Sequence, residues 1–325
     1  RLEREHAADQ QPRPLATTSA VGHVGLLVHG SADAVAAVVV RAAVPRRRGA
    51  AGCIRARGST DTGAVSTAGS AISPHDSTTL PDGLGAPLRR EREALYAEGV
   101  IAGRSGRRFD VWPVGMTRDA GAALRDLVRE PIAGAPSASG AGARPRRALE
   151  TGLAFGLASS FILEGLAHNA ETGAGPGGGF HLTSIDPFQT RDWDGAGVEH
   201  LTRAGAAPAH TLIEEGSETA MAHLASRGAR FDFIFLDGDH RFDAVFVDLF
   251  FAARLVRPGG LVVLDDAWMP SVRKAAAFGV RNGVFFADPR PHGPSEAGAS
   301  PLKRFLLLRA NPDAHLRPWD HFVDF

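Results

Sequence analysis

The chain has 325 residues, 44% of them hydrophobic, so it is long enough to bury the core of one large domain. Lysine plus arginine and aspartate plus glutamate number 36 each, which excludes a global positive field that would recruit nucleic acid or an anionic membrane. The single cysteine, Cys53, excludes an internal disulfide and any site built from several cysteines, and a cytoplasmic protein is expected.

The first 86 residues are biased toward alanine, arginine, glycine, serine, threonine and proline. Such a composition is typical of segments that cannot bury an apolar core, so we expect residues 1–86 to form a low-complexity, disordered extension. Within it, the apolar stretch Val21–Val44 is interrupted by two histidines, an aspartate and an arginine. These polar groups are too many for a membrane span, and no membrane partner is expected.

Residues 87–145 are expected to hold N-terminal helices and a linker. Leu88–Glu98 has the composition of a charged helix, and Thr117–Glu130 has the spacing of an amphipathic one. The hydroxyl of Thr117 is placed to cap the second helix, and Pro131 is placed to end it. A linker rich in glycine, alanine, serine and proline then leads to residue 145.

From residue 146 to residue 325, short β-rich runs alternate with helical segments. This alternation predicts an α/β fold with a doubly wound, mostly parallel, Rossmann-like sheet of seven strands. The predicted strands are Ala148–Glu150, Phe180–Ile185, Thr211–Glu214, Phe231–Leu236, Leu261–Leu264, Val284–Phe286 and Phe305–Arg309.

The clearest predicted helix lies between the fourth and fifth of these strands. From Phe242 to Val256 apolar residues recur at helical spacing and form a continuous stripe, which includes Phe246 and Phe250. We expect this stripe to belong to the hydrophobic core. The sequence Pro258-Gly-Gly is placed to end the helix.

A glycine turn follows the first predicted strand. Glu150 ends that strand, and Gly152 and Gly156 allow a ligand to approach the backbone closely. The Gly-x-Gly-x-x-Gly pattern of dinucleotide sites is absent, and an acid at this place suits a positively charged ligand better than a phosphate. The alternative is a tight turn beside a surface acid.

Carboxylates also follow three further strands. Asp186 is placed to accept hydrogen bonds from a ribose diol, unless it serves only the turn before a proline. Asp237 ends the fourth strand, and Asp265 and Asp266 end the fifth. Neighbouring strands lie about 4.8 Å apart, so these carboxylates can share one hard cation, for which magnesium is favoured over zinc. Alternatively, Asp237 contacts a cofactor ammonium and the other two acids cap a loop.

These features together resemble the class I S-adenosylmethionine-dependent methyltransferases, and within them the small-molecule O-methyltransferases of the catechol O-methyltransferase type and their bacterial relatives. The resemblance covers roughly Val111 to Arg309 and implies a Rossmann-like methyltransferase sheet. It rests on the glycine turn, Asp186, Glu215-Gly216-Ser217-Glu218, Asp237-Gly-Asp-His240 and Asp265-Asp266, which occur in the family's order.

The resemblance implies which residues contact S-adenosylmethionine. The implied cofactor contacts are Glu150, Gly152 and Gly156 at the methionine end, Asp186 at the ribose, Gly216 and Ser217 at the adenine, Asp237 near the ammonium, and Met116 and Thr117 in the segment that covers the cofactor. One departure from the family is Ala158, which stands where a small hydroxyl residue is common.

The resemblance also implies a metal and a base. In metal-dependent members three ligands follow the fourth and fifth strands, and here these positions are Asp237, Asp265 and Asp266, which implies Mg²⁺. His240 stands where relatives carry a proposed general base. A histidine near a cation and a substrate hydroxyl can accept the hydroxyl proton. The alternative is a helix N-terminal histidine that only contacts neighbouring acids.

The sequence therefore predicts S-adenosylmethionine-dependent methyl transfer to a hydroxyl of a small molecule, with Asp237 and His240 as catalytic residues. A nicotinamide-dependent oxidoreductase on the same fold, or a non-catalytic binding protein that uses Trp268 and Trp319, are the alternatives. A nucleic-acid partner is not expected, because the charge is neutral and no base-flipping motif occurs. The acceptor and the formation of a homodimer stay open.

Overall fold

The computed structural model describes residues 83–134, 143–172, 179–288 and 304–325. Residues 1–82, which hold nearly all of the predicted extension 1–86, lie outside the described residues. All elements described below lie within residues 83–325. The domain boundaries expected after residues 86 and 145 stay predictions.

The two predicted N-terminal helices are confirmed. They are α1 (Gly85–Glu98) and α2 (Arg118–Arg129), and the hydroxyl of Thr117 caps α2 by accepting the backbone N–H three residues further on. Between them β1 (Val100–Ala102) and β2 (Arg108–Asp110) pair as an antiparallel hairpin. This hairpin was not predicted, because strands of three residues are too short for a recognisable alternation.

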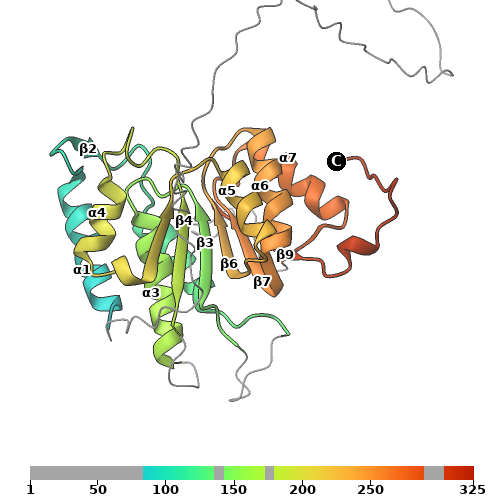
Figure 1. The fold of residues 1–325 in the computed structure, drawn as a ribbon, viewed down its shortest axis with the longest axis horizontal. Coiled ribbons are helices and arrows are strands. Elements are labelled where there is room, and N and C mark those ends of the chain that lie inside the picture. Colours follow the sequence, from blue (N-terminus) through green and yellow to red (C-terminus); the bar gives the residue numbers. More distant parts are fainter. Residues whose placement is uncertain (1–82, 135–142, 173–178, 289–303) are drawn as a thin grey trace, which may run out of the picture. The chain divides into compact units, whose positions relative to one another are not determined.

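The described residues contain a seven-stranded sheet with the order β5-β4-β3-β6-β7-β9-β8 (Figure 1). Pairing is parallel from β5 to β7 and antiparallel at β9 and β8, which confirms the predicted doubly wound, mostly parallel sheet. The strands are β3 (Arg147–Thr151), β4 (His181–Ile185), β5 (His210–Ile213), β6 (Phe231–Leu236), β7 (Val256–Leu264), β8 (Phe285–Ala287) and β9 (Leu306–Ala310).

Helices cover both faces of the sheet, with α1, α3 and α4 on one side and α5, α6 and α7 on the other (Figure 1). Each face buries its own cluster of apolar side chains, as a doubly wound sheet requires. These helices are α3 (Leu157–Thr172), α4 (Ala196–Arg203), α5 (Ser217–Ser226), α6 (Phe242–Leu255) and α7 (Pro270–Arg281), with short 3₁₀ turns η1 (Ala207–Ala209) and η3 (Ala314–Leu316).

The apolar stripe predicted for α6 is only partly buried. Val245 and Leu249 are in the core, but Phe242 and Phe250 are 39% and 46% exposed, so the expectation that the whole stripe is core is wrong at these two positions. The reason is that the stripe is wider than the helix face that the sheet covers. On the covered face the polar residue Asp248 is buried, at 3% exposure.

A buried ion cluster fastens the N-terminal helices to the sheet domain. Glu164 of α3 is 2% exposed and accepts hydrogen bonds from Arg89 at 2.8 Å and from the buried Arg92 at 2.7 Å, both on α1. Arg125 and Arg129 of α2 approach the same carboxylate to 3.6 Å. One buried acid thus joins three helices.

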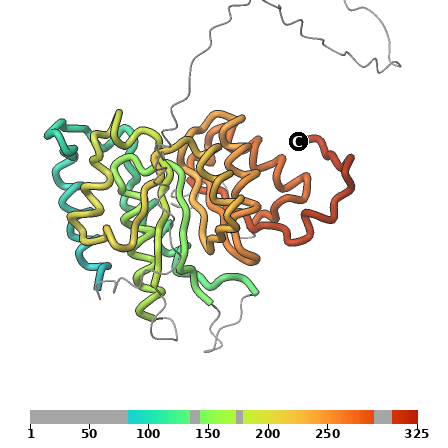
Figure 2. The backbone as a smooth tube through the Cα atoms, viewed as in Figure 1, coloured from blue at the N-terminus to red at the C-terminus, as the bar shows by residue number. Residues whose placement is uncertain are grey.

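The C-terminal segment packs against α6 and α7 (Figure 2). Asn282 exchanges two hydrogen bonds of 2.8 Å with the backbone of Val323, and the ring of Phe325 packs against Phe242 and Phe278. Part of the exposed side of the α6 stripe therefore has a partner in the last residues of the chain. Within the described ranges, no helix is long and apolar enough to cross a membrane.

Candidate active site

The carboxyl ends of the central strands meet in one row of backbone hydrogen bonds. The N–H of Gly152 donates to Ile185 at 2.8 Å, that of Asp237 to Thr151 at 3.1 Å, and that of Asp265 to Leu236 at 3.0 Å. The residues that follow β3, β6 and β7 are therefore held side by side. This is the edge at which open α/β sheets bind ligands.

The glycine turn lies directly against the end of β6. Gly152 has a φ of +85°, and a Cβ there would collide with the carbonyl oxygen of Asp237. Gly156 also has a positive φ, of +72°. Both predicted glycines are therefore required by backbone geometry, and the turn leaves no room for a side chain beside Asp237.

Glu150 is fully buried at the end of β3, not exposed beside a tight turn. Its Oε1 accepts hydrogen bonds from the hydroxyls of Ser184, at 2.5 Å, and Ser159. Its Oε2 is buried and has no hydrogen-bond partner among the described residues. Burial raises the pKa of Glu150 to about 7, although the two hydroxyls oppose this shift. The free oxygen needs a donor, which a positively charged ligand can supply.

Asp186 is also buried and connects β4 to the glycine turn. Its Oδ2 accepts from the N–H of Ala154 at 2.9 Å and from Gln189 at 3.0 Å, and its Oδ1 accepts from the N–H of Phe188 at 2.8 Å. A ribose diol bound here would share the carboxylate with these donors. The ribose role stays a prediction.

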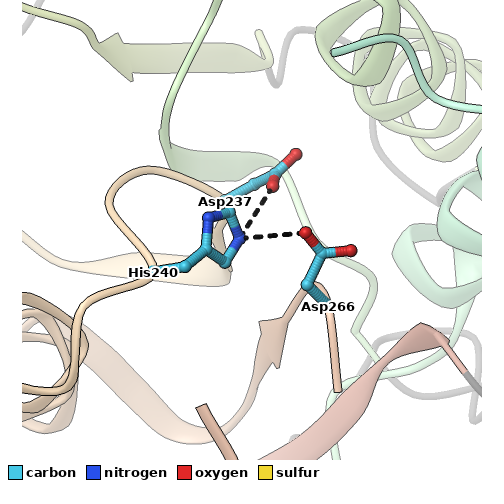
Figure 3. Close-up of side chains that lie close together, drawn as sticks. All are labelled: Asp237, His240 and Asp266. Atoms are coloured by element: carbon cyan, nitrogen blue, oxygen red, sulfur yellow. Dashed lines mark ion pairs between the residues drawn. The ribbon is translucent and has the colours of Figure 1, made fainter. Parts of the chain in front are cut away.

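Three side chains at the ends of β6 and β7 point toward one another (Figure 3). His240 Nε2 lies 3.6 Å from Asp237 Oδ1 and 3.3 Å from Asp266 Oδ2. One potential ligand atom from each residue lies within 4.8 Å of the others, and each side chain keeps between 20% and 26% of its surface exposed. Two carboxylates and an imidazole at such short distances are a suitable donor set for a divalent cation.

The electrostatics of this group follow from its crowded acids. Burial, and then the charge of Asp265, raises the pKa of Asp237 well above its usual value. The contact with Asp237 raises the pKa of His240, and the charge of Asp266 adds to that effect against the opposing effect of partial burial. A proton or a metal cation at this point therefore relieves repulsion among the acids.

Asp265 does not belong to this group, although it was predicted as a metal ligand. Its buried carboxylate forms a paired ion contact with Arg304, from Nε to Oδ1 at 2.5 Å and from Nη2 to Oδ2 at 2.7 Å. The structure thus groups Asp237 and Asp266 with His240, where the sequence grouped them with Asp265. The metal itself stays a prediction.

Gly216 and Ser217, which follow the third predicted strand, lie at the N-terminus of α5. Gly216 precedes the helix and Ser217 is its first residue. The hydroxyls of Ser217 and Thr151 lie near the buried Asp248 of α6, where burial raises the pKa of that acid to about 6 and the hydroxyls oppose the shift. A contact of Ser217 with adenine stays a prediction.

Met116 and Thr117 both have structural tasks in the described residues. The side chain of Met116 is in the core, its carbonyl accepts from the hydroxyl of Tyr96 at 2.7 Å, and Thr117 caps α2. Neither observation tests whether this segment covers the cofactor.

Several site residues could not be found from the sequence. Arg304 lies 39 residues after its partner Asp265, and Ser184 and Asp248 sit inside a strand and a helix with no motif around them. Ser159 carried a partial signal, because the serines come one and two residues after the position where the family has a hydroxyl group.

Comparison with known proteins finds one matching domain model and a set of similar structures. Residues 149–267 match a family model described as a methyltransferase domain. No match was found among curated proteins.

Three solved structures illustrate the likeness. An O-methyltransferase from Bacillus cereus, in complex with SAH, is 14% identical over 72% of this chain and 93% of its own, with a TM-score of 0.49. The O-methyltransferase TomG from Streptomyces achromogenes, involved in tomaymycin synthesis and in complex with SAM, is 18% identical over 72% of this chain and 93% of its own, with a TM-score of 0.45. An SAH-bound methyltransferase from Podospora anserina is 16% identical over 71% of this chain and 88% of its own, with a TM-score of 0.45.

The matched range contains the glycine turn, Asp186, Ser217, the group around His240, and both acids after β7. Residues 149–267 of the chain therefore match a methyltransferase domain, in agreement with the methyltransferase resemblance of its sequence.

Proposed function

We propose that this protein transfers the methyl group of S-adenosylmethionine to a hydroxyl group of a small molecule, assisted by a divalent metal ion. The observation that carries the proposal is that the glycine turn after β3 packs directly on Asp237, beside the group of Asp237, His240 and Asp266. A site for the methyl donor and a site that activates a hydroxyl would thus lie next to each other within one methyltransferase domain.

The chemistry of the glycine turn fits this methyl donor. S-adenosylmethionine carries a positive sulfonium and an ammonium group, and Glu150 offers a buried carboxylate oxygen with no partner among the described residues. The close packing at Gly152 lets a ligand lie against backbone in place of a side chain. Dinucleotides, which bring phosphates, would meet this acid unfavourably.

The residues at the ends of β6 and β7 fit a divalent cation, which would lower the pKa of a bound hydroxyl. Asp237 and Asp266 belong both to the predicted ligand set and to the group in Figure 3. For the third ligand there are two candidates: Asp265, once it is released from Arg304, and His240. An all-oxygen set favours Mg²⁺, and an imidazole favours a transition metal.

With Asp265 as the third ligand, His240 is free to act as the general base. It accepts the proton of the acceptor hydroxyl, and the oxygen then attacks the methyl carbon as the carbon–sulfur bond breaks. S-adenosylhomocysteine and the methyl ether are the products. The protein contributes positioning and the electrostatic field of its acids.

Methyl transfer from labelled S-adenosylmethionine to a panel of phenols, sugars, and polyketide or peptide natural products tests the function. We expect turnover with at least one acceptor class, and a loss of at least about 100-fold for Asp266→Ala or in the presence of a chelator. Asp313→Ala, at an exposed acid in the C-terminal segment, is the control and should keep full activity. Undiminished turnover in chelator contradicts the metal part of the proposal.

The two candidates for the third ligand can be separated by metal binding alone. If Asp265 is the ligand, Asp265→Asn weakens Mn²⁺ binding and His240→Gln changes it little. If His240 is the ligand, the order is reversed. Calorimetric titration of each variant with Mn²⁺ gives the answer without an acceptor.

A further inference from the structure

A polar chain crosses three neighbouring strands beneath the glycine turn. Ser184 on β4 stands opposite Glu150 on β3 and donates its hydroxyl proton to Glu150 Oε1 at 2.5 Å. The same hydroxyl oxygen lies 2.7 Å from Nε2 of His210, the first residue of β5. Ser184 therefore connects a fully buried carboxylate to a half-buried imidazole.

The direction of these hydrogen bonds follows from the groups involved. An ionised carboxylate only accepts, and a serine hydroxyl has one proton to donate. When Ser184 gives that proton to Glu150, its oxygen must accept from His210, so His210 carries its proton on Nε2. Burial lowers the pKa of His210 to about 4, and this keeps the ring neutral at neutral pH, as the arrangement requires.

Few charged groups lie near Glu150 and His210, the two ends of this series of hydrogen bonds. At Glu150 the neighbours are the hydroxyl of Ser159 on α3, the hydroxyl of Ser184, and the acid Asp186 at the end of β4, whose charge raises the pKa of Glu150. At His210 the titratable neighbour is His181, on β4, which lowers the pKa of His210. No cation lies within hydrogen-bond distance of the Glu150 carboxylate among the described residues, so hydroxyl donors alone support its charge.

We propose that Ser184 and His210 are positioning residues that favour the ionised form of Glu150 and fix its carboxylate, with Oε2 left free for the positively charged end of the methyl donor. This inference rests on the proposed function, since it assumes that S-adenosylmethionine binds at the glycine turn. Binding of a cation should then release the proton that remains on Glu150. Ser159, Ser184 and His210 determine what fraction of Glu150 is already ionised before the ligand binds.

Calorimetric titration of the full chain with S-adenosylmethionine, from pH 6 to 9 in buffers of different ionisation enthalpy, measures both affinity and protons released. Since the pKa of Glu150 is about 7, the wild-type protein should release about half a proton from this group at pH 7. Glu150→Gln gives the contribution of the ligand's own amine, which is subtracted.

For Ser184→Ala we expect affinity about 10-fold weaker at pH 7, more protons released, and recovery toward wild type at pH 9. Ser184→Thr keeps the hydroxyl and should restore the wild-type profile. A second pair of variants is independent of Ser184: His210→Gln can still donate to the serine, whereas His210→Leu cannot and should resemble Ser184→Ala.

The matched control is Thr211→Val. Thr211 contacts His181 at 2.9 Å and joins the same two strands on the opposite face of the sheet, so it tests loss of a similar contact away from Glu150. The inference is overturned if Ser184→Ala and His210→Leu behave like Thr211→Val, with affinity and proton release within two-fold of wild type. If folded wild-type protein binds no S-adenosylmethionine, the proposed function fails as well, and that result is recognisable in the wild type alone.

Discussion

At Gly152 the chain turns with a φ of +85° while the carbonyl oxygen of Asp237 occupies the space of a side chain. Gly152→Ala should lower the free energy of unfolding by at least about 3 kcal/mol, because both the conformation and the contact are unfavourable for alanine. Gly228 is the control, since its φ is +71° and no described heavy atom lies within 4 Å of the position that a Cβ would take there. Gly228→Ala should cost about 1 kcal/mol. Equal urea midpoints for the two variants would show that the turn does not pack on β6.

Glu150 makes stability depend on pH in a defined direction. In the folded protein its pKa is about 7, above the value of an exposed glutamate, so the folded state holds this proton in a range where the unfolded state has lost it. Stability is therefore lost as the pH rises from about 5 to about 8, by roughly 3 kcal/mol for this group. Glu150→Gln should remove that slope. Urea unfolding of both proteins across this range checks it, and parallel curves would contradict it.

Some site residues were predictable because each lies beside its strand in the sequence. Glu150 is the second-last residue of β3, and Asp237 directly follows β6, so the chain itself carries both acids to the sheet edge. The partner of Asp265 was not predictable, because Arg304 reaches it through the pairing of β7 with β9. The grouping of His240 with Asp266 likewise depends on side-chain directions that spacing does not determine.

At the scale of elements, the buried Glu164 is the link between the N-terminal helices and α3. Glu164→Gln would leave Arg92, which is 2% exposed, without a charged partner at that carboxylate, and should cost about 3–5 kcal/mol. Glu199→Gln is the control, because its pair with Arg104 is 36% and 56% exposed and should contribute less than about 1 kcal/mol. Thermal unfolding of both variants makes the comparison; similar losses would rule out a special role for the cluster.

The contact of Arg304 with Asp265 joins the start of β9 to the end of β7 at the candidate metal site. Arg304→Gln removes a positive charge and frees the carboxylate, so Mn²⁺ should bind about 10-fold more tightly than to the wild-type protein. Arg309→Gln, in β9 and paired with Asp288, should leave the affinity unchanged. Calorimetric titration with Mn²⁺ measures these affinities. Equal affinities for Arg304→Gln and the wild-type protein would mean that Asp265 is not a metal ligand.

Element types were well predicted where the periodicity was long. The predicted helices and strands all occur, with ends shifted by a few residues, because tertiary packing agrees with the local pattern. The hairpin of β1 and β2 was missed, and the α6 stripe was assigned to the core too widely. A sequence shows that a stripe is apolar, but not how much of it a neighbouring sheet covers.

For the whole molecule, the mostly parallel sheet and its two covered faces followed from the alternation of strands with helices. What alternation cannot supply is the identity of the ligand, because binding residues come from loops and strand ends. The match of residues 149–267 to a methyltransferase domain favours a methyl donor as the ligand, and the free carboxylate oxygen of Glu150 gives a physical reason for a cationic ligand.

The central claim is tested most directly by calorimetric titration of the full chain with S-adenosylmethionine, beside titrations with NAD⁺ and NADH. The account predicts micromolar binding of S-adenosylmethionine, stronger in the presence of Mg²⁺, and no binding of either nicotinamide cofactor. Binding of a nicotinamide cofactor, or no heat with S-adenosylmethionine in a protein shown to be folded by circular dichroism, would contradict it.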